Sequence, residues 1–336
     1  MGVSNLLNRR KAIARAASLG GGALFCTLGL PGKSASAAEK VDFSWISSSD
    51  GLPFFVALEE KLFEAEGIEP VSNKFGSPAL VVDTFVSGRG DVGPGAVAAG
   101  IALIAESQFP GTVRFFGFAG GQVKPTLLVN NGLVARKDSA IKDFWDLKGK
   151  RLGVVPGIQW KTISRYIIRK AGLDPDKDVQ SVALALPMQT QAVISGNVDA
   201  LLTFEPMVSM AVATGDVKVV VSNPCQRFIH DPFWGGAFVV TTKLLNKQPA
   251  VVDKIINVLS EGTRLVRKDL DRYKPLLHKY AGMPEKTLPF IKPELYRIGK
   301  EIDERDIAGF QSFADLLFEE GAIRKKLDVK PLIVSS

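Results

Sequence analysis

Between Val41 and Val221 the chain alternates short apolar runs typical of strands with longer amphipathic runs typical of helices. This alternation is the pattern of an α/β fold, in which helices connect parallel strands. We therefore expect an α/β fold with mainly parallel sheets. The chain is too long for one small core, so two lobes of ~100–200 residues each are expected.

Several elements of this pattern have defined positions. One helix is expected over 53–66, and a helix of small residues over 96–105. The segment 127–136 is either a strand that crosses from one lobe to the other or a hairpin that turns at Asn131 and Gly132. A strand over 237–242 is expected to return the chain to the first lobe.

The first residues have the composition of an export signal. Residues 9–11 are basic and follow Asn8, residues 12–30 are mildly apolar, and 34–38 are small residues that contain an A-x-A site. The arginine pair and the weakly apolar glycines 20–22 favour the twin-arginine route, with the general secretory route as the alternative. We expect cleavage after Ala37 and a periplasmic mature protein. The apolar run is too short and too interrupted for a membrane anchor.

Removing this leader changes the charge balance. The leader holds five basic and no acidic residues, so the formal net charge falls from +7 to about +2. The remaining sequence has no basic stripe with interleaved aromatic residues, which argues against nucleic-acid binding. Only Cys225, His230 and His278 remain of the cysteines and histidines. We therefore expect no internal disulfide, no metal site and no cofactor.

The chain is thus expected to divide into a leader, residues 1–37, and two lobes. The first lobe would comprise 38–130 and 238–336, and the second lobe 131–237. From Pro249 onward the pattern of apolar residues predicts helices, and these helices are expected to pack on the first lobe.

The strongest motif is the segment 146–157. It runs from a charged turn into a strand, a glycine turn and the helix that begins near Gln159. This order leaves backbone N–H groups free to bind a small anionic or polar group. Four further segments form a recognisable pattern together with this motif: 51–60, 87–93, 195–200 and 204–206.

In this order, the segments resemble the solute-binding proteins of nitrate, sulfonate and taurine ABC importers, which are related to the thiamine-pyrimidine precursor binders. The resemblance implies the two-lobed periplasmic binding protein fold of type II, with one ligand in the cleft between the lobes. It also implies a monomer without enzymatic activity. Such a protein would capture a small organic solute (a sulfonate, a taurine-like or a nitrogenous compound) by lobe closure. It would deliver the solute to a membrane permease with a cytoplasmic ATPase.

In such a fold the ligand groups come from turns after strands and from helix N-termini. The expected ligand-binding residues are Ser48, Ser49, Asp50, Ser77, Gly95, Gly157, Ile158, Gln159, Trp160, Glu205 and Trp234. No arginine is placed to bind a sulfonate or carboxylate, so an anion would rest on backbone N–H groups and hydroxyls. A cleft-facing Glu205 would instead favour an amine, amide N–H or hydroxyl.

Most of these residues also have a purely structural interpretation. Ser77 could be only a helix N-cap, Asp50 only a turn residue, and Gly157 only a site of positive φ. Glu205 begins a helix, whose dipole favours a carboxylate with or without a ligand. Trp160 could belong to the core, as could Trp234, which lies beside Pro232.

Two alternatives to an importer component remain open. The first is an enzyme on the same fold, similar to the pyrimidine-precursor synthases, which carry a cysteine-rich motif, a lysine-bound pyridoxal and a sacrificial histidine. Here Cys225 stands alone, and a nucleophilic pair of Cys225 with His230 would be its nearest equivalent. The second alternative is a solute sensor that docks on a membrane signalling protein.

Overall fold

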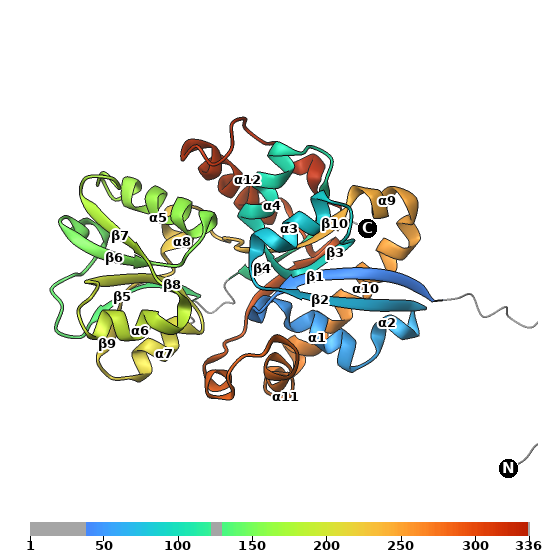
Figure 1. Ribbon diagram of the computed structural model, residues 1–336, viewed down its shortest axis with the longest axis horizontal. Coiled ribbons are helices and arrows are strands. Elements are labelled where there is room, and N and C mark those ends of the chain that lie inside the picture. Colours follow the sequence, from blue (N-terminus) through green and yellow to red (C-terminus); the bar gives the residue numbers. More distant parts are fainter. Residues whose placement is uncertain (1–37, 122–129, 335–336) are drawn as a thin grey trace, which may run out of the picture. The chain divides into compact units, whose positions relative to one another are not determined.

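The computed structural model describes residues 38–121 and 130–334, which form one unit. The leader with its cleavage site, and residues 127–129 of the expected crossing strand, lie outside the described residues. Two mixed sheets organise the described chain, each covered by helices on both faces (Figure 1). The expected α/β class, built around two sheets, is confirmed.

The first sheet has the strand order β11-β4-β10-β3-β1-β2. Its strands are β1 (Glu39–Ile46), β2 (Ile68–Phe75), β3 (Val92–Ala98), β4 (Val113–Gly121), β10 (Gly236–Thr241) and β11 (Leu295–Ile298). Strand β1 pairs in parallel with β2 and β3, whereas β10 is antiparallel to both of its neighbours and β11 is antiparallel to β4.

The second sheet has the order β7-β6-β8-β5-β9. Its strands are β5 (Asn131–Arg136), β6 (Lys150–Val154), β7 (Val179–Ala183), β8 (Ala200–Phe204) and β9 (Val217–Ser222). Strand β6 is parallel to β7 and β8, and β5 is antiparallel to β8 and β9. Most strands of each sheet therefore run in one direction, as expected, but β5, β10 and β11 run against the others and make both sheets mixed. The strands that follow each passage between the sheets, β5 and β10, enter their sheets antiparallel.

Helices cover both faces of the first sheet. The helices assigned to this sheet are α1 (Leu52–Glu59), α2 (Leu62–Ala65), α3 (Pro78–Val86), α4 (Ala99–Gln108), α9 (Thr242–Lys247), α10 (Pro249–Lys268), α11 (Leu270–Tyr273) and α12 (Glu304–Glu319). Helices α1 and α10 cover one face, and α3, α4 and α12 cover the other (Figure 1). Phe43 of β1 stacks on Phe54 of α1 with ring centroids 5.0 Å apart.

Helix α10 lies against α1, as its apolar stripe predicts. Val252, Ile255, Ile256 and Leu259 are all buried there. The approach is so close that a Cβ atom on Gly262 would collide with the carbonyl oxygen of Pro53. Glycine is therefore required at this position for the two helices to meet.

The second sheet is covered by four helices: α5 (Ile158–Lys170), α6 (Leu186–Ile194), α7 (Met207–Ala213) and α8 (Pro224–Phe228). Helices α5 and α8 lie on one face, and α6 and α7 on the other (Figure 1). A salt-bridged contact also joins α5 to the end of α12, where Glu320 accepts from Arg165 and Arg169.

Three local expectations differ from the structure. The helix expected over 53–66 is broken at Lys61, which has a φ of 55°, so α2 starts anew after it. The helix expected over 96–105 begins three residues later, because Ala96–Ala98 continue β3 beside β10. Asn131 and Gly132 form no hairpin; they begin β5, where Asn131 pairs with β8 and Gly132 pairs with both β8 and β9.

Candidate functional site

The turns that follow the parallel strands gather at one edge of each sheet, which is the edge where ligands bind in open α/β sheets. In the first sheet these strands are β1, β2 and β3, and in the second they are β6, β7 and β8. All expected site residues except Trp234 lie in or directly after these strands. We describe this edge below as the carboxyl-terminal edge.

The loop after β1 holds the polar residues of the first lobe. Ser48 caps the short 3₁₀ helix η1 (Ser49–Gly51), and its hydroxyl accepts from the backbone N–H of Asp50 at 3.2 Å. The Ser49 hydroxyl is buried and donates to Glu294 Oε1 at 2.7 Å. The Tyr296 hydroxyl donates to the other Glu294 oxygen at 3.2 Å. The loop is thereby fixed to a segment 245 residues further along the chain.

Asp50 and Glu294 form a pair of neighbouring carboxyl groups. Burial raises the pKa of Asp50. Burial, reinforced by the Asp50 charge, raises the pKa of Glu294 well above its usual value. Two carboxylates in one partly buried site disfavour double ionisation, so this pair retains a proton more readily than two exposed carboxylates would.

Glycines allow the backbone to approach Asp50. Gly95 has a φ of +90°, and a Cβ atom on it would lie 2.6 Å from the carbonyl oxygen of Asp50. A Cβ on Gly236 would lie 2.8 Å from the Asp50 carboxylate. Gly95 therefore lies beneath the Asp50 loop, where it makes room for the loop.

Ser77 acts as the N-cap of α3. Its side chain accepts from the backbone N–H of Leu80 at 3.4 Å. The structural interpretation accounts for this residue, since the described contacts join it to no other member of the candidate site.

The turn after β6 forms a hydrogen-bonded contact with the carboxyl-terminal edge of the first sheet. Gly157 is the N-cap of α5 with a φ of +105°, and Ile158 begins the helix with 44% of its surface exposed. Gln159 is buried, and its amide oxygen accepts from Gly100 N–H at 2.8 Å while its amide nitrogen donates to Gly235 C=O at 3.1 Å.

This contact supplies a cap that α4 lacks. The N-cap residue of α4 is Ala98, which has no side chain that accepts a hydrogen bond. Gln159 satisfies one of the free N–H groups of α4 from a different sheet. The sequence predicted Gln159 as a ligand-binding residue; in this structure one donor and one acceptor of its amide join the two carboxyl-terminal edges.

The indole ring of Trp160 stacks on Phe204. The two ring centroids are 5.3 Å apart and the planes 18° from parallel. Both side chains are half-buried. Trp160 thus packs on the core with one side and keeps part of its surface at the carboxyl-terminal edge.

Glu205 is buried at the start of α7. Its carboxylate accepts from the Ser209 N–H at 3.0 Å and from the Ser209 hydroxyl at 2.8 Å. Burial raises its pKa, and the hydrogen bonds from Ser209 act in the opposite direction. Its described contacts are those of a helix-capping residue, as the structural interpretation allows.

Trp234 lies in the core. Its side chain is fully buried and stacks on Phe118, with ring centroids 5.6 Å apart. Within the described residues its indole nitrogen has no hydrogen-bond partner. Its ring lies against Gly121 at the end of β4, where a Cβ atom would collide with it. Trp234 is therefore a buried residue packed beneath the carboxyl-terminal edge, and its role in ligand binding stays a prediction.

Sequence analysis missed Glu294, Tyr296, Gly100 and Gly235. The first two belong to a segment without a recognisable motif, and the two glycines contribute only backbone atoms. Nothing in the local sequence signals that they would lie beside Asp50 or Gln159.

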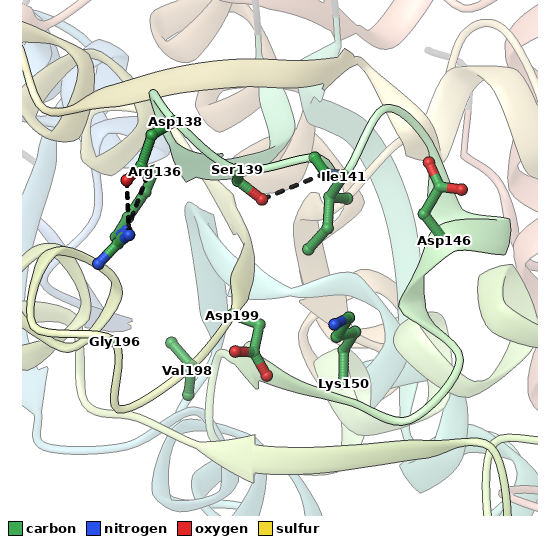
Figure 2. A pocket seen from close by; sticks show the side chains of 10 residues that line it. Arg136, Asp138, Ser139, Ile141, Asp146, Lys150, Gly196, Val198 and Asp199 are labelled. Atoms are coloured by element: carbon green, nitrogen blue, oxygen red, sulfur yellow. Dashed lines mark hydrogen bonds and ion pairs between the residues drawn. The ribbon is translucent and has the colours of Figure 1, made fainter.

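The described surface also has a pocket at the opposite, amino-terminal edge of the second sheet, shown in Figure 2. It is lined by Arg136, Asp138, Ser139, Ala140, Ile141, Asp146, Lys150, Gly196, Val198 and Asp199. Arg136 pairs with Asp138 at 2.7 Å. None of the expected site residues lines this pocket, so it is separate from the candidate site.

The described contacts of Cys225 and His230 do not support the alternative of a nucleophilic pair. The Cys225 thiol is fully buried, and burial raises its pKa far above the usual value. His230 Nδ1 lies 3.2 Å from the carbonyl oxygen of Pro232.

Among residues 38–121 and 130–334, no group of three or more potential ligands could hold a metal ion, and no helix has the length and hydropathy needed to cross a membrane.

Known proteins match this chain over most of its length. A curated relative from Bacillus subtilis, named for aliphatic sulfonate binding, is 25% identical over 203 residues, which are 60% of each chain. The solved structure of the periplasmic aliphatic sulphonate binding protein SsuA from Escherichia coli superposes with a TM-score of 0.71 at 20% identity. That superposition covers 87% of this chain and 91% of the other, and it supports the two-lobed periplasmic binding protein fold.

A relative with a different activity is also similar. The 4-amino-5-hydroxymethyl-2-methylpyrimidine phosphate synthase of Schizosaccharomyces pombe is 26% identical over 248 residues, which cover 70% of this chain and 67% of the synthase. The chain spans about 60% of the length of the sulfonate-binding relatives that it matches. The family described as "NMT1/THI5 like" matches residues 48–271, which is more than half of the sequence, and the chain therefore belongs to this family.

Proposed function

We propose that the protein is the extracytoplasmic solute-binding component of an ABC importer. It would capture a small organic solute between two lobes, 38–130 with 238–336 and 131–237, and deliver it to a membrane permease with a cytoplasmic ATPase. The mature protein would be a periplasmic monomer, released by cleavage after Ala37.

The observation that carries this proposal is the Gln159 bridge. It joins the carboxyl-terminal edge of the second sheet to that of the first, at the edges where such folds bind ligands. A contact that forms only when the two edges are close is what a protein that closes on its ligand requires. The similarity to sulfonate-binding relatives supports the same role.

The proposal is tested by releasing the ligand from protein purified in native form and identifying it by mass spectrometry. One small molecule per chain is expected, and adding it back to the emptied protein should contract the protein in small-angle X-ray scattering. An unchanged scattering profile at saturating ligand would argue against capture by closure. Sequencing of the mature N-terminus should start at Ala38.

The synthase relative makes catalysis the second candidate function. Its support here is weak, because the buried Cys225 thiol offers no accessible nucleophile.

A sensor role is separated from import by uptake measurements. Loss of the protein should abolish uptake of the released ligand; unchanged uptake with a lost transcriptional response would favour the sensor.

A further inference from the structure

An ionic contact joins helix α5 of the second sheet to the end of helix α12 of the first sheet. Glu320 Oε1 accepts from Arg169 Nε at 3.0 Å, and Glu320 Oε2 accepts from Arg169 Nη2 at 3.2 Å. The same Oε2 atom also accepts from Arg165 Nε at 3.4 Å. Only 2% of the Glu320 side chain is exposed. We call these three residues the α5 clamp.

The clamp places charges where a single helix does not favour them. Glu320 is the C-cap of α12, and the dipole of a helix opposes a carboxylate at its C-terminus. Arg165 and Arg169 are four positions apart on α5, where like charges repel each other. Asp176 offsets part of this repulsion, since its Oδ2 accepts from Arg165 Nη2 at 2.8 Å. The charges of the clamp therefore favour contact between α5 and α12.

The apolar core is continuous between the same two helices. Ile163 and Ile167 of α5 and Phe313 and Leu317 of α12 are fully buried, and all four belong to one hydrophobic cluster. Helix α5 contacts α4 as well as α12. Separating α5 from α12 would expose large apolar side chains to water, which costs free energy in proportion to their area. We therefore expect this contact to persist whenever the protein is folded.

A second contact between the two lobes lacks such a core. Helix α7 of the second sheet contacts the 3₁₀ helix η4 (Glu285–Phe290). The buried apolar side chains of α7 belong to a cluster whose described members lie within 134–219. Ile291, just after η4, belongs to a different cluster, formed by residues within 41–119 and 238–334. The hydrophobic cores of the two lobes are therefore separate on this side.

The charges on this side are also less closely paired. Lys292 follows η4, and its positive charge acts on the buried Glu205 at the start of α7. Within the described part of the chain, no hydrogen bond or ion pair joins these two side chains. Moving α7 away from η4 would thus break neither a continuous core nor a close ion pair, so it costs less than moving α5 away from α12.

We propose that the α5 clamp is the fixed pivot of lobe closure: α5 stays on α12 in the open and closed states, and the lobes separate at α7 and η4. This inference rests on the proposed function, because it states how the two lobes would move. Gln159 lies ten residues before Arg169 on α5, a distance of about 15 Å along the helix. A rotation about the clamp would therefore separate Gln159 from Gly100 while Arg169 keeps its partner.

The first test ties the two helices together. Lys170 and Glu319 lie beside the clamp with Nζ and Oε2 3.9 Å apart, and each side chain is about half exposed. Lys170→Cys and Glu319→Cys are joined by a short bismaleimide linker in the mature protein after its bound solute has been removed; the buried Cys225 should not react. Small-angle X-ray scattering should give the same radius of gyration with and without the linker. A smaller radius with the linker would show that the contact opens without ligand, which would overturn the inference.

The linked protein also separates a pivot from a contact that forms only on closure. At saturation, the solute released from the native protein should contract the linked and the unlinked protein equally. Contraction of the unlinked protein alone would overturn the inference and leave the proposed function standing. Contraction of neither protein would reject lobe closure, and with it both the proposed function and the pivot.

A substitution in the clamp gives an independent measurement. Glu320→Gln keeps the size of the side chain but removes the charge that both arginines bind, so the midpoint of urea denaturation should fall. A contact present in both states does not bias the equilibrium between them. Affinity for the released solute, measured by calorimetric titration, should therefore change by less than about threefold. Glu319→Gln is the matched control, because its side chain is 53% exposed, and it should change neither quantity.

Two results with these variants would overturn the inference. A larger fall in affinity for Glu320→Gln would show that the clamp forms only in the closed state. An unchanged denaturation midpoint in both Glu320→Gln and Arg169→Gln would show that the clamp does not hold the helices together. Arg169 is 54% exposed, so its replacement keeps the test valid even if the Glu320 variant fails to fold.

Discussion

The two edges of the second sheet differ in how their side chains are satisfied. At the amino-terminal edge, two arginines are paired with aspartates that line the pocket of Figure 2. Arg136 binds Asp138, and Arg151 binds Asp199 at 3.2 Å. At the carboxyl-terminal edge, apolar side chains remain exposed, and the buried amide of Gln159 is bonded to another sheet.

This difference indicates that the amino-terminal edge is ordinary solvent-exposed surface and that the carboxyl-terminal edge is the better candidate for a binding site. Exposed ion pairs need no further partner, because water and the paired charge already satisfy them. At the carboxyl-terminal edge, exposed apolar side chains gain free energy only when another group covers them. The N-terminus of α4 is likewise capped only by a residue from the other sheet. A pocket beside paired charges is therefore a weaker functional signal here than an edge with exposed apolar surface. The predictions below compare the two edges.

The largest effect is expected for Gly95→Ala at the carboxyl-terminal edge. The new Cβ would lie 2.6 Å from the Asp50 carbonyl oxygen at a φ of +90°, so the free energy of unfolding should fall by about 2–4 kcal/mol. Urea denaturation measures this. Gly149→Ala is the control at the other edge, because it has a φ of +73° but no atom within 4 Å of its Cβ. An equal loss in both variants would show that the contact with Asp50 contributes nothing.

The next effect is expected for Gln159→Leu. It removes both hydrogen bonds and leaves the Gly100 N–H without its acceptor. The free energy of unfolding should fall by about 1–3 kcal/mol, and affinity for the native ligand should fall with it. Gln191→Leu on the exposed face of α6 is the matched control. Unchanged stability in the Gln159 variant would mean that the bridge does not hold the edges together.

A smaller, pH-dependent effect is expected for Glu294→Gln. The pKa of Glu294 is raised well above 4.5 in the folded protein, so the folded state holds this proton more tightly than the unfolded state does. The stability contributed by the protonated group is therefore present at low pH and lost as the pH rises from 4.5 through the folded pKa. Denaturation of both proteins across this range should give a difference that changes with pH. A difference independent of pH would contradict the raised pKa.

The smallest effect is expected for Arg136→Ala at the amino-terminal edge. Its ion pair with Asp138 is exposed, with 47% and 70% of the two side chains accessible. The free energy of unfolding should change by no more than about 0.5 kcal/mol. Ligand affinity should stay unchanged in the same calorimetric titration. A loss of affinity would assign the pocket of Figure 2 a role in binding and reverse the comparison of the two edges.

Local sequence patterns were enough to predict the class of fold and several single residues. The alternation of strands and helices, the buried stripe of α10 and the capping role of Ser77 each depend on residues a few positions apart. The positive φ of Gly157 belongs to the same group, since a glycine before a helix serves such a turn. These features depend on interactions between residues close together in the sequence, so they can be predicted from the sequence alone.

Tertiary structure alone decided the order of the strands and the partners of the site residues. Nothing in 237–242 indicates that β10 lies antiparallel between β3 and β4. Asp50 meets Glu294 from the far end of the chain, and Gln159 meets the backbone of Gly100 and Gly235. Such contacts depend on how the two sheets and the C-terminal segment pack together. That packing decides which atoms distant in sequence come within hydrogen-bonding distance.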